Sequence, residues 1–266
     1  MDMKSEFFNG LLEEEVYVEQ PPGFEQKTIG DKVYKLKKAL YDLKQVPRDG
    51  ESIIQVQIYV YDIIFRSTNK ELCEKFSNLM QGTFEVIMIG ELTFFLRLQV
   101  NQMKGGTFIS QTKYTRYLMK KFGMKEKSSV KIPMNTHVKM DIDVEGKVVD
   151  QTRYRSLIRS LFYLAASRPD ITFVVGVCAR FQSAPKESHM AAAKRILRYL
   201  NGCQEFGSWY PKKGGFKLVG YSNSDYAGCR VDRKSTSYTC QMLVNRLVSW
   251  FSKRQNSIAT STTEAE

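Results

Sequence analysis

The sequence predicts an α+β fold with at least two units, because three regions of different pattern follow one another along the chain. Strand-like and helix-like segments mix up to about residue 110, helical periodicity dominates 111–200, and strand-like alternation dominates 216–266. Hydrophobic residues make up 42% of the 266 residues, which is enough for a packed core. Charged residues at 26%, with only 17 Gly and 7 Pro, argue against a disordered chain.

The first segments are short and punctuated by proline. Residues 12–19 predict a strand, which the Pro21-Pro22-Gly23 turn ends. Residues 33–45 carry Leu36, Leu40 and Leu43 at helix-like spacing, with lysines between them, so we expect a helix that stops before Pro47.

A hairpin and a helix follow. Residues 53–65 are rich in β-branched and aromatic side chains and predict two strands that meet near Tyr61-Asp62. Residues 69–81 predict a helix that Asn69 caps and Gly82 ends, because Leu72, Phe76 and Leu79 form one apolar face.

Beyond residue 90, a second hairpin leads into the helical region. Residues 92–100 and 107–110 predict strands around Lys104-Gly105-Gly106, and 111–122 predict a helix that Gly123 ends. Polar residues dominate 124–151, which we expect to be an irregular connection. Further helices are expected at 153–166, 170–182 and 186–200, the last with Pro185 in its first turn, and strands at 216–221, 238–244 and 247–252.

The net charge of +12 is unevenly distributed. Residues 1–100 carry 12 basic and 16 acidic side chains, whereas 101–266 carry 28 basic and 12 acidic ones. A segment with a net charge of +16 attracts polyanions and favours a nucleic-acid partner, although a basic, soluble surface without a ligand is the alternative.

Cysteine and histidine usage narrows the possible chemistry. The five cysteines stand singly and the two histidines, His137 and His189, are far apart, so neither a disulfide framework nor a zinc site is expected. No apolar run approaches the ~20 residues of a membrane span, and Asp2 and Glu6 interrupt any secretory signal. We therefore expect an intracellular protein without membrane contact, in which carboxylates carry any catalysis.

Several blocks of the chain resemble the Pol polyprotein of copia-type LTR retrotransposons, in the same order as in that family. The resemblance covers nearly the whole chain, and it includes Leu36-Lys37-Lys38-Ala39-Leu40-Tyr41-Asp42-Leu43, Tyr59-Val60-Tyr61-Asp62, Tyr154-Arg155-Ser156-Leu157-Ile158, Ser167-Arg168-Pro169-Asp170, Gly220-Tyr221-Ser222-Asn223-Ser224-Asp225 and Ser261-Thr262-Thr263-Glu264-Ala265-Glu266.

The resemblance implies three parts of a reverse transcriptase with an RNase H-like region. These are a partial palm at 1–105, a basic helical thumb and connection at 106–215, and a truncated RNase H-like α/β segment at 216–266. It also implies a template-primer or RNA–DNA hybrid as partner, and Mg²⁺ or Mn²⁺ held by carboxylates as cofactor. Localisation to a cytoplasmic particle and the nucleus is implied by the resemblance alone.

Catalytic positions of the polymerase part are altered. Asp2 and Asp62 match family metal ligands, but Tyr61 stands where the family motif Tyr-Val-Asp-Asp has its first aspartate. A phenol with a reference pKa near ~10 is neutral at pH 7 and cannot replace that charge. Around 49–52 the chain also lacks a few dozen family residues, so we expect an internal deletion. Arg97 and Arg159 stand where the family has glycine, and we do not expect Arg97 to adopt a glycine conformation.

The RNase H-like part is altered in the same way. Asn223 replaces a family aspartate, and Glu266 matches the second family carboxylate but is the last residue. We therefore expect both activities to be lost in this copy. Asp225 is expected to have a local role.

Three hypotheses of different classes remain. The first is a polymerase that uses Asp2 and Asp62, the second a non-catalytic module that binds nucleic acid, and the third a decayed element without function. The second hypothesis assigns nucleic-acid binding to basic residues of the helices at 113–125 and 186–200 and of the last region: Lys120, Lys121, Lys194, Arg195, Arg198 and Arg230.

Overall fold

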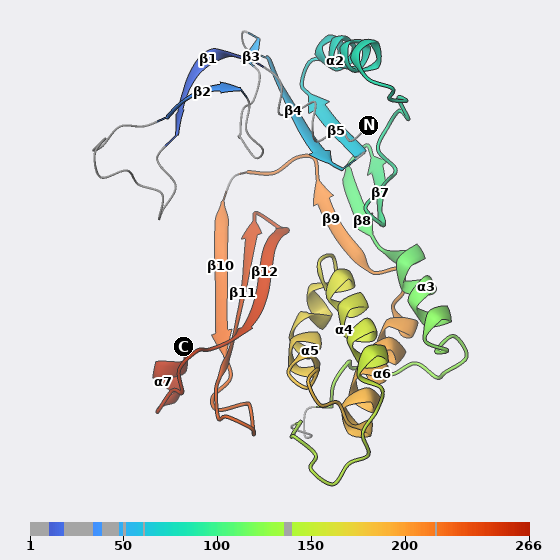
Figure 1. Cartoon of the computed structure of the whole chain (residues 1–266), viewed down its shortest axis with the longest axis vertical. Coiled ribbons are helices and arrows are strands. Elements are labelled where there is room, and N and C mark those ends of the chain that lie inside the picture. The colour runs from blue at the N-terminus through green and yellow to red at the C-terminus, as the bar shows by residue number, and fades with distance from the viewer. Residues whose placement is uncertain are drawn as a thin grey trace. The chain divides into compact units, whose positions relative to one another are not determined.

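A computed structural model of the chain describes residues 11–18, 34–38, 48–49, 52–60, 62–135, 140–215 and 217–266, with side chains from Ile54 onward. The architecture mixes helices with antiparallel sheets, which confirms the α+β class (Figure 1). The chain forms two compact units, Met1–Leu92 and Thr93–Glu266. The three-part division predicted from the sequence has its boundaries at 105 and 215, which differ from this boundary at residue 92. That division stays a prediction. None of the described helices is long and apolar enough to cross a membrane.

The described residues of the first unit form two small sheets and the helix α2 (Lys70–Thr83). Strand β1 (Leu11–Val18) pairs with β2 (Tyr34–Lys38), and β4 (Ser52–Tyr59) lies between β3 (Arg48–Asp49) and β5 (Asp62–Ser67). The hairpin predicted to turn near Tyr61-Asp62 is confirmed, because Tyr59 pairs with Asp62. Helix α2 packs on β5 through an edge-to-face contact of Phe76 with Phe65 at 4.9 Å between ring centroids.

Two predictions in this unit are wrong. Residues 34–38 form a strand rather than the start of a helix over 33–45, because the backbone of β2 pairs with β1. The alternation of Tyr34 and Leu36 with lysines fits a strand over these few residues, and 39–47 lie outside the described residues. Helix α2 does begin after the Asn69 cap, whose Oδ1 accepts from the Glu71 amide at 2.9 Å. It continues through Gly82, and the Phe84 amide closes it on the Met80 carbonyl.

The core of the second unit lies in a bundle of four helices: α3 (Thr112–Lys121), α4 (Gln151–Ala165), α5 (Pro169–Ala179) and α6 (Glu187–Gly202) (Figure 1). Leu118, Leu161 and Leu197 come from three of these helices, and the solvent reaches none of them. The four predicted helices are thus confirmed, with two changes of detail. Pro169 is the first residue of α5, and Pro185 precedes α6, whose N-cap is Lys186.

A four-stranded sheet joins the two ends of the bundle. Its order is β6 (Phe94–Phe95), β7 (Leu98–Met103), β8 (Gly106–Ser110) and β9 (Gly207–Pro211), so the strand before α3 pairs with the strand after α6. The sequence did not predict β9. Glycine allows this pairing at Gly106, where a Cβ atom would lie 2.4 Å from the Tyr210 carbonyl oxygen.

The last region is a three-stranded antiparallel sheet on helix α5. Strands β10 (Leu218–Ser224), β11 (Thr236–Leu243) and β12 (Arg246–Arg254) confirm the prediction, and the short helix α7 (Thr262–Ala265) follows. The Trp250 indole donates to the Ala165 carbonyl at 3.1 Å, and Tyr238 meets Phe173 edge to face at 5.0 Å. The sheet is therefore attached to the bundle by one side of β11 and β12.

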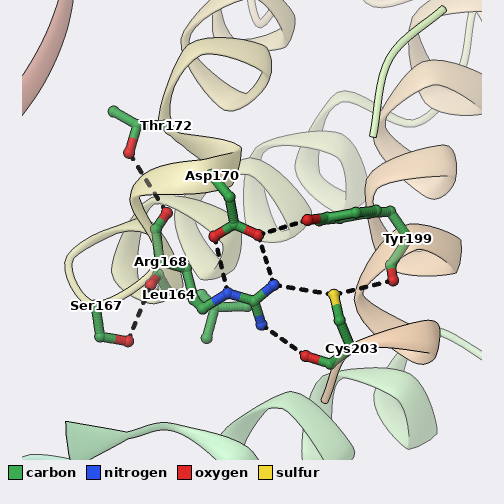
Figure 2. Close-up of polar contacts among 7 residues, drawn as sticks. All are labelled: Leu164, Ser167, Arg168, Asp170, Thr172, Tyr199 and Cys203. Carbon is green, nitrogen blue, oxygen red and sulfur yellow. Dashed lines mark hydrogen bonds and ion pairs between the residues drawn. The ribbon is translucent and has the colours of Figure 1, made fainter. Parts of the chain in front are cut away.

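The buried guanidinium of Arg168 forms an ion pair with Asp170 at the start of α5 and bonds Cys203 at the end of α6 (Figure 2). The Arg168 side chain is 3% exposed, and its Nη2 lies 2.6 Å from Oδ2 of Asp170. Arg168 also donates to the carbonyl oxygen and the sulfur of Cys203, both at 3.0 Å, and the Tyr199 hydroxyl donates to Asp170 at 2.8 Å. Burial alone would raise the pKa of the Asp170 carboxyl, but the hydrogen bond and charge of Arg168 hold this pKa below its usual value.

The Arg168–Asp170 pair makes the free energy of unfolding depend on pH in the acidic range. The folded-state pKa of Asp170 is below the unfolded value of ~3.9, so its stabilisation is complete above that value and is lost as the pH falls through the folded pKa. Asp170→Asn leaves a buried guanidinium without its carboxylate, and we expect the free energy of unfolding at pH 7 to fall by about 2 kcal/mol, as for the loss of a hydrogen bond to a charged group. The difference between wild type and variant should shrink below pH ~4, as measured by urea unfolding across pH.

Asp232 provides the matched control. It pairs with Arg254 at the same 2.6 Å, and its side chain is 28% exposed against 30% for Asp170, but the Arg254 side chain is 45% exposed whereas that of Arg168 is 3% exposed. Asp232→Asn should therefore cost less than about 1 kcal/mol. Equal losses in the two variants would contradict a structural role of the Arg168 pair.

Candidate nucleic-acid interface

Asp62, which the sequence predicts as a polymerase carboxylate, is the first residue of β5 at the turn of the β4–β5 hairpin, and its side chain is exposed. The turn includes Val60 in the left-handed region, with φ of 54°. Asp2 and Tyr61 lie outside the described residues.

The donor set at this hairpin does not fit a two-metal site. Mg²⁺ takes oxygen ligands and is held in such sites by several carboxylates. Asp62 supplies one carboxylate, and its neighbour Tyr61 is a neutral phenol where the family motif has the second. Within the residues that the structure describes, no group of three or more His, Cys, Asp or Glu side chains could hold a metal ion.

The residues predicted to belong to an RNase H-like site, Asn223, Asp225 and Glu266, have different surroundings in the structure. Asn223 is exposed on β10 opposite Tyr238. Asp225 follows β10 and is used locally, because its carboxylate accepts from the Thr236 amide at 2.6 Å and from the Tyr238 hydroxyl at 3.3 Å. Glu266 is exposed just after α7, where its backbone amide bonds the Thr262 carbonyl.

The predicted basic residues of α6 differ from those of α3. Arg198 donates from Nε to the Ser128 carbonyl at 2.9 Å and from Nη2 to the Ser128 hydroxyl at 3.0 Å, so it holds the connection after α3 in place. Lys194 is half-buried, and Arg195 has a buried Nε without a hydrogen-bond partner. Arg230 is exposed after β10. Of this group, Arg198 has a structural contact that competes with ligand binding.

The two lysines of α3 lie at its exposed C-terminal turn, where they meet helix α4. Lys120 is exposed, and Lys121 Nζ lies 3.4 Å from Oγ of Ser156 on α4. Arg153 and Arg159 are exposed and stand three residues before and after Ser156. Residues three apart lie on the same side of a helix, so these cations share one face. We call Lys120, Lys121, Arg153 and Arg159 the α3–α4 cationic surface.

Acidic residues are absent from both helices of this surface. Helices α3 and α4 carry seven basic side chains between them and no Asp or Glu. Arg116 and Arg155 are already engaged within the protein, since Arg116 pairs with Glu205 at 3.2 Å and Arg155 donates to the Gln182 carbonyl at 3.1 Å. Sequence reasoning missed the contribution of α4, although the lack of acids over 151–165 is visible in the sequence.

Comparison with known proteins relates this chain to polymerases of transposons. The reverse transcriptase (RNA-dependent DNA polymerase) family matches residues 1–49 and 46–136, about half of the chain. The chain is 33% identical over its whole length to the Pol polyproteins of transposons RE2 and RE1 of Arabidopsis thaliana, and 31% identical to that of transposon TNT 1-94 of Nicotiana tabacum. No solved structure matches.

The matched relatives are much longer proteins. The chain spans 20% of the length of the RE2 and RE1 polyproteins and 23% of TNT 1-94. The alignment with RE2 has 294 positions for the 266 residues of this chain, so at least 28 residues of the relative have no counterpart here. Similarity of the whole chain to three such polyproteins, together with the family match, shows that this chain belongs to the reverse transcriptase family of copia-type retrotransposon Pol polyproteins.

Proposed function

We propose that this chain binds a nucleic-acid template-primer or an RNA–DNA hybrid without catalysing either polymerisation or RNA cleavage. In this proposal residues 1–105 are a partial palm, 106–215 a thumb and connection, and 216–266 an RNase H-like part. The observation that carries the proposal is the α3–α4 cationic surface, which presents exposed Lys and Arg side chains on two helices without any acidic residue.

Electrostatics makes this surface suited to phosphates. Each cation that neutralises a phosphate releases a condensed counterion, which drives binding at low salt. The surrounding segment 101–266 has a net charge of +16, so the long-range field has the same sign as the local one. Lys194, Arg195 and Arg230 can add further contacts of this kind.

Loss of catalysis follows from the chemistry of two positions. Tyr61 and Asn223 are neutral where the family has metal-binding aspartates, and without those charges Mg²⁺ or Mn²⁺ lacks its usual ligands. The internal deletion is supported by the 28 or more missing residues and by the break of the family match at 46–49. At this point the chain turns back at once, because Asp49 pairs with Ser52.

An active polymerase is the second candidate, because Asp62 is retained at the turn of an exposed hairpin. Its carboxylate could hold one divalent ion together with Asp2 and the substrate phosphates.

Binding should depend steeply on salt. We expect log K for a fluorescent RNA–DNA hybrid to fall linearly with log salt, as measured by fluorescence anisotropy. Lys120→Gln/Lys121→Gln should lower the magnitude of this slope by about 2, one charge per lysine. The exposed neighbouring pair Lys212 and Lys213 provides a matched double variant that should leave the slope nearly unchanged. A flat response of the wild type would refute the proposal.

Primer extension should be absent with either Mg²⁺ or Mn²⁺. The physical reason is the missing carboxylate at position 61, so added metal cannot restore the site. The assay follows incorporation into a labelled primer and includes Asp62→Asn and a mock preparation as controls. Incorporation by the wild type that Asp62→Asn abolishes, and that the mock preparation lacks, would show an active polymerase instead.

A further inference from the structure

The turn between β6 and β7 has two consecutive residues in the left-handed region. Leu96 has φ of 46° and Arg97 has φ of 64°, and Phe95 pairs directly with Leu98 on either side of them. Hairpins with this two-residue turn favour asparagine and glycine, because a Cβ atom disfavours positive φ. Contrary to the expectation from sequence, Arg97 does adopt the positive φ that glycine favours. Contacts elsewhere must therefore stabilise the turn.

Three tyrosines of the helix bundle supply those contacts. The Tyr163 hydroxyl donates to the Leu96 carbonyl. The Arg97 guanidinium lies over the rings of Tyr114, Tyr117 and Tyr163, at 4.9, 5.8 and 6.0 Å from their centroids. Such cation–π contacts stabilise a cation without neutralising its charge.

The three rings form a rigid frame. Tyr114 is buried, stacks on Tyr117 at 6.0 Å and meets Tyr163 edge to face at 5.2 Å. Its hydroxyl donates to the Ser160 carbonyl of α4 at 3.4 Å. Because α3 and α4 both contribute rings, the guanidinium is positioned against the bundle rather than by the turn alone.

Arg97 is held in place, but its charge is not neutralised by the protein. Its side chain is exposed, and within the described part of the chain no carboxylate forms an ion pair with it. Tyr117 is shared with the ammonium group of Lys121, which lies 6.0 Å from its ring. Arg97 therefore adds to one end of the α3–α4 cationic surface.

We propose that Arg97 is a phosphate-binding residue of this chain, positioned by Tyr114, Tyr117 and Tyr163 to contact the backbone of a bound nucleic acid. The proposal rests on the proposed function and adds a contact that a glycine at this position lacks. A planar guanidinium offers paired N–H donors to a phosphate, and one whose rotation is already restricted loses less entropy on binding. Tyr117 and Tyr163 are 50% and 40% exposed, which leaves ring surface for a neighbouring base.

The test compares two arginines that share backbone strain and exposure but differ in surroundings. Arg233 also has positive φ, 59°, and is exposed, and no ring contact involves it in the described part of the chain. Arg97→Gly and Arg233→Gly each remove one charge and relieve the same strain. Binding of a 20-base-pair RNA–DNA hybrid is measured by anisotropy at several salt concentrations, with a thermal melt of each protein.

We expect Arg97→Gly to weaken binding about 5- to 10-fold at 0.1 M salt and to lower the magnitude of the salt slope by about 0.9. Arg97→Lys should keep the slope but weaken binding about threefold, because an ammonium cannot donate as a planar fork. Arg233→Gly should bind like the wild type.

The outcomes distinguish the role of Arg97 from the proposed binding of nucleic acid by the whole chain. A wild type with no salt-dependent binding overturns both proposals. A wild type that binds, with Arg97→Gly equal to Arg233→Gly, overturns the role of Arg97 alone. If Arg97→Gly loses its cooperative melt, Tyr117→Leu decides, because it keeps the Arg97 charge and removes a half-exposed ring. Unchanged binding by Tyr117→Leu then overturns the proposal, and a severalfold loss supports it.

Discussion

The buried guanidinium of Arg168 is the constraint on which the arrangement of the second unit depends. A charged group at 3% exposure is tolerated only when ion pairing and hydrogen bonds replace its water. Arg168 meets this demand with Asp170 at the start of α5 and the Cys203 carbonyl at the end of α6. The ring of Phe206 lies 5.5 Å from the same guanidinium. The end of α6 at Gly202 is thereby fixed five residues before strand β9 begins at Gly207.

Fixing that end has consequences for the surface. Because β9 starts where the Arg168 contacts end, it pairs with β8, the strand that leads into α3. The same sheet holds β6 and β7, so the turn with Arg97 is brought against the tyrosines of α3 and α4. The contacts of a buried guanidinium at one end of the bundle thus help to define an exposed cationic surface on α3 and α4.

Local pattern was enough to predict much of this fold. Helical spacing of apolar residues predicts α3 to α6, and alternation of β-branched residues predicts the hairpin that carries Asp62. Strand β9 is not evident in the sequence, since its pairing depends on the close approach of Gly106 to Tyr210, a contact between residues about a hundred positions apart. Strand β2 was mistaken for a helix because five residues are too few to separate the two periods. The positive φ of Arg97 depends on tyrosine rings from helices α3 and α4, and the residues next to Arg97 in the sequence do not predict these contacts.

The candidate site was harder to predict than the fold, because the sequence does not show which basic side chains already have hydrogen-bond or ion-pair partners within the protein. Arg198 is predicted from the sequence to bind nucleic acid, yet it donates to Ser128 within the protein. Arg116 and Arg155 have protein partners as well. A catalytic site needs carboxylates that converge from distant segments, so one neutral residue such as Tyr61 removes its charge balance. A cationic surface is built from neighbouring turns of two packed helices, and each of its contacts acts nearly independently. Substitutions that end metal-dependent catalysis in such a chain can therefore leave its affinity for nucleic acid largely in place.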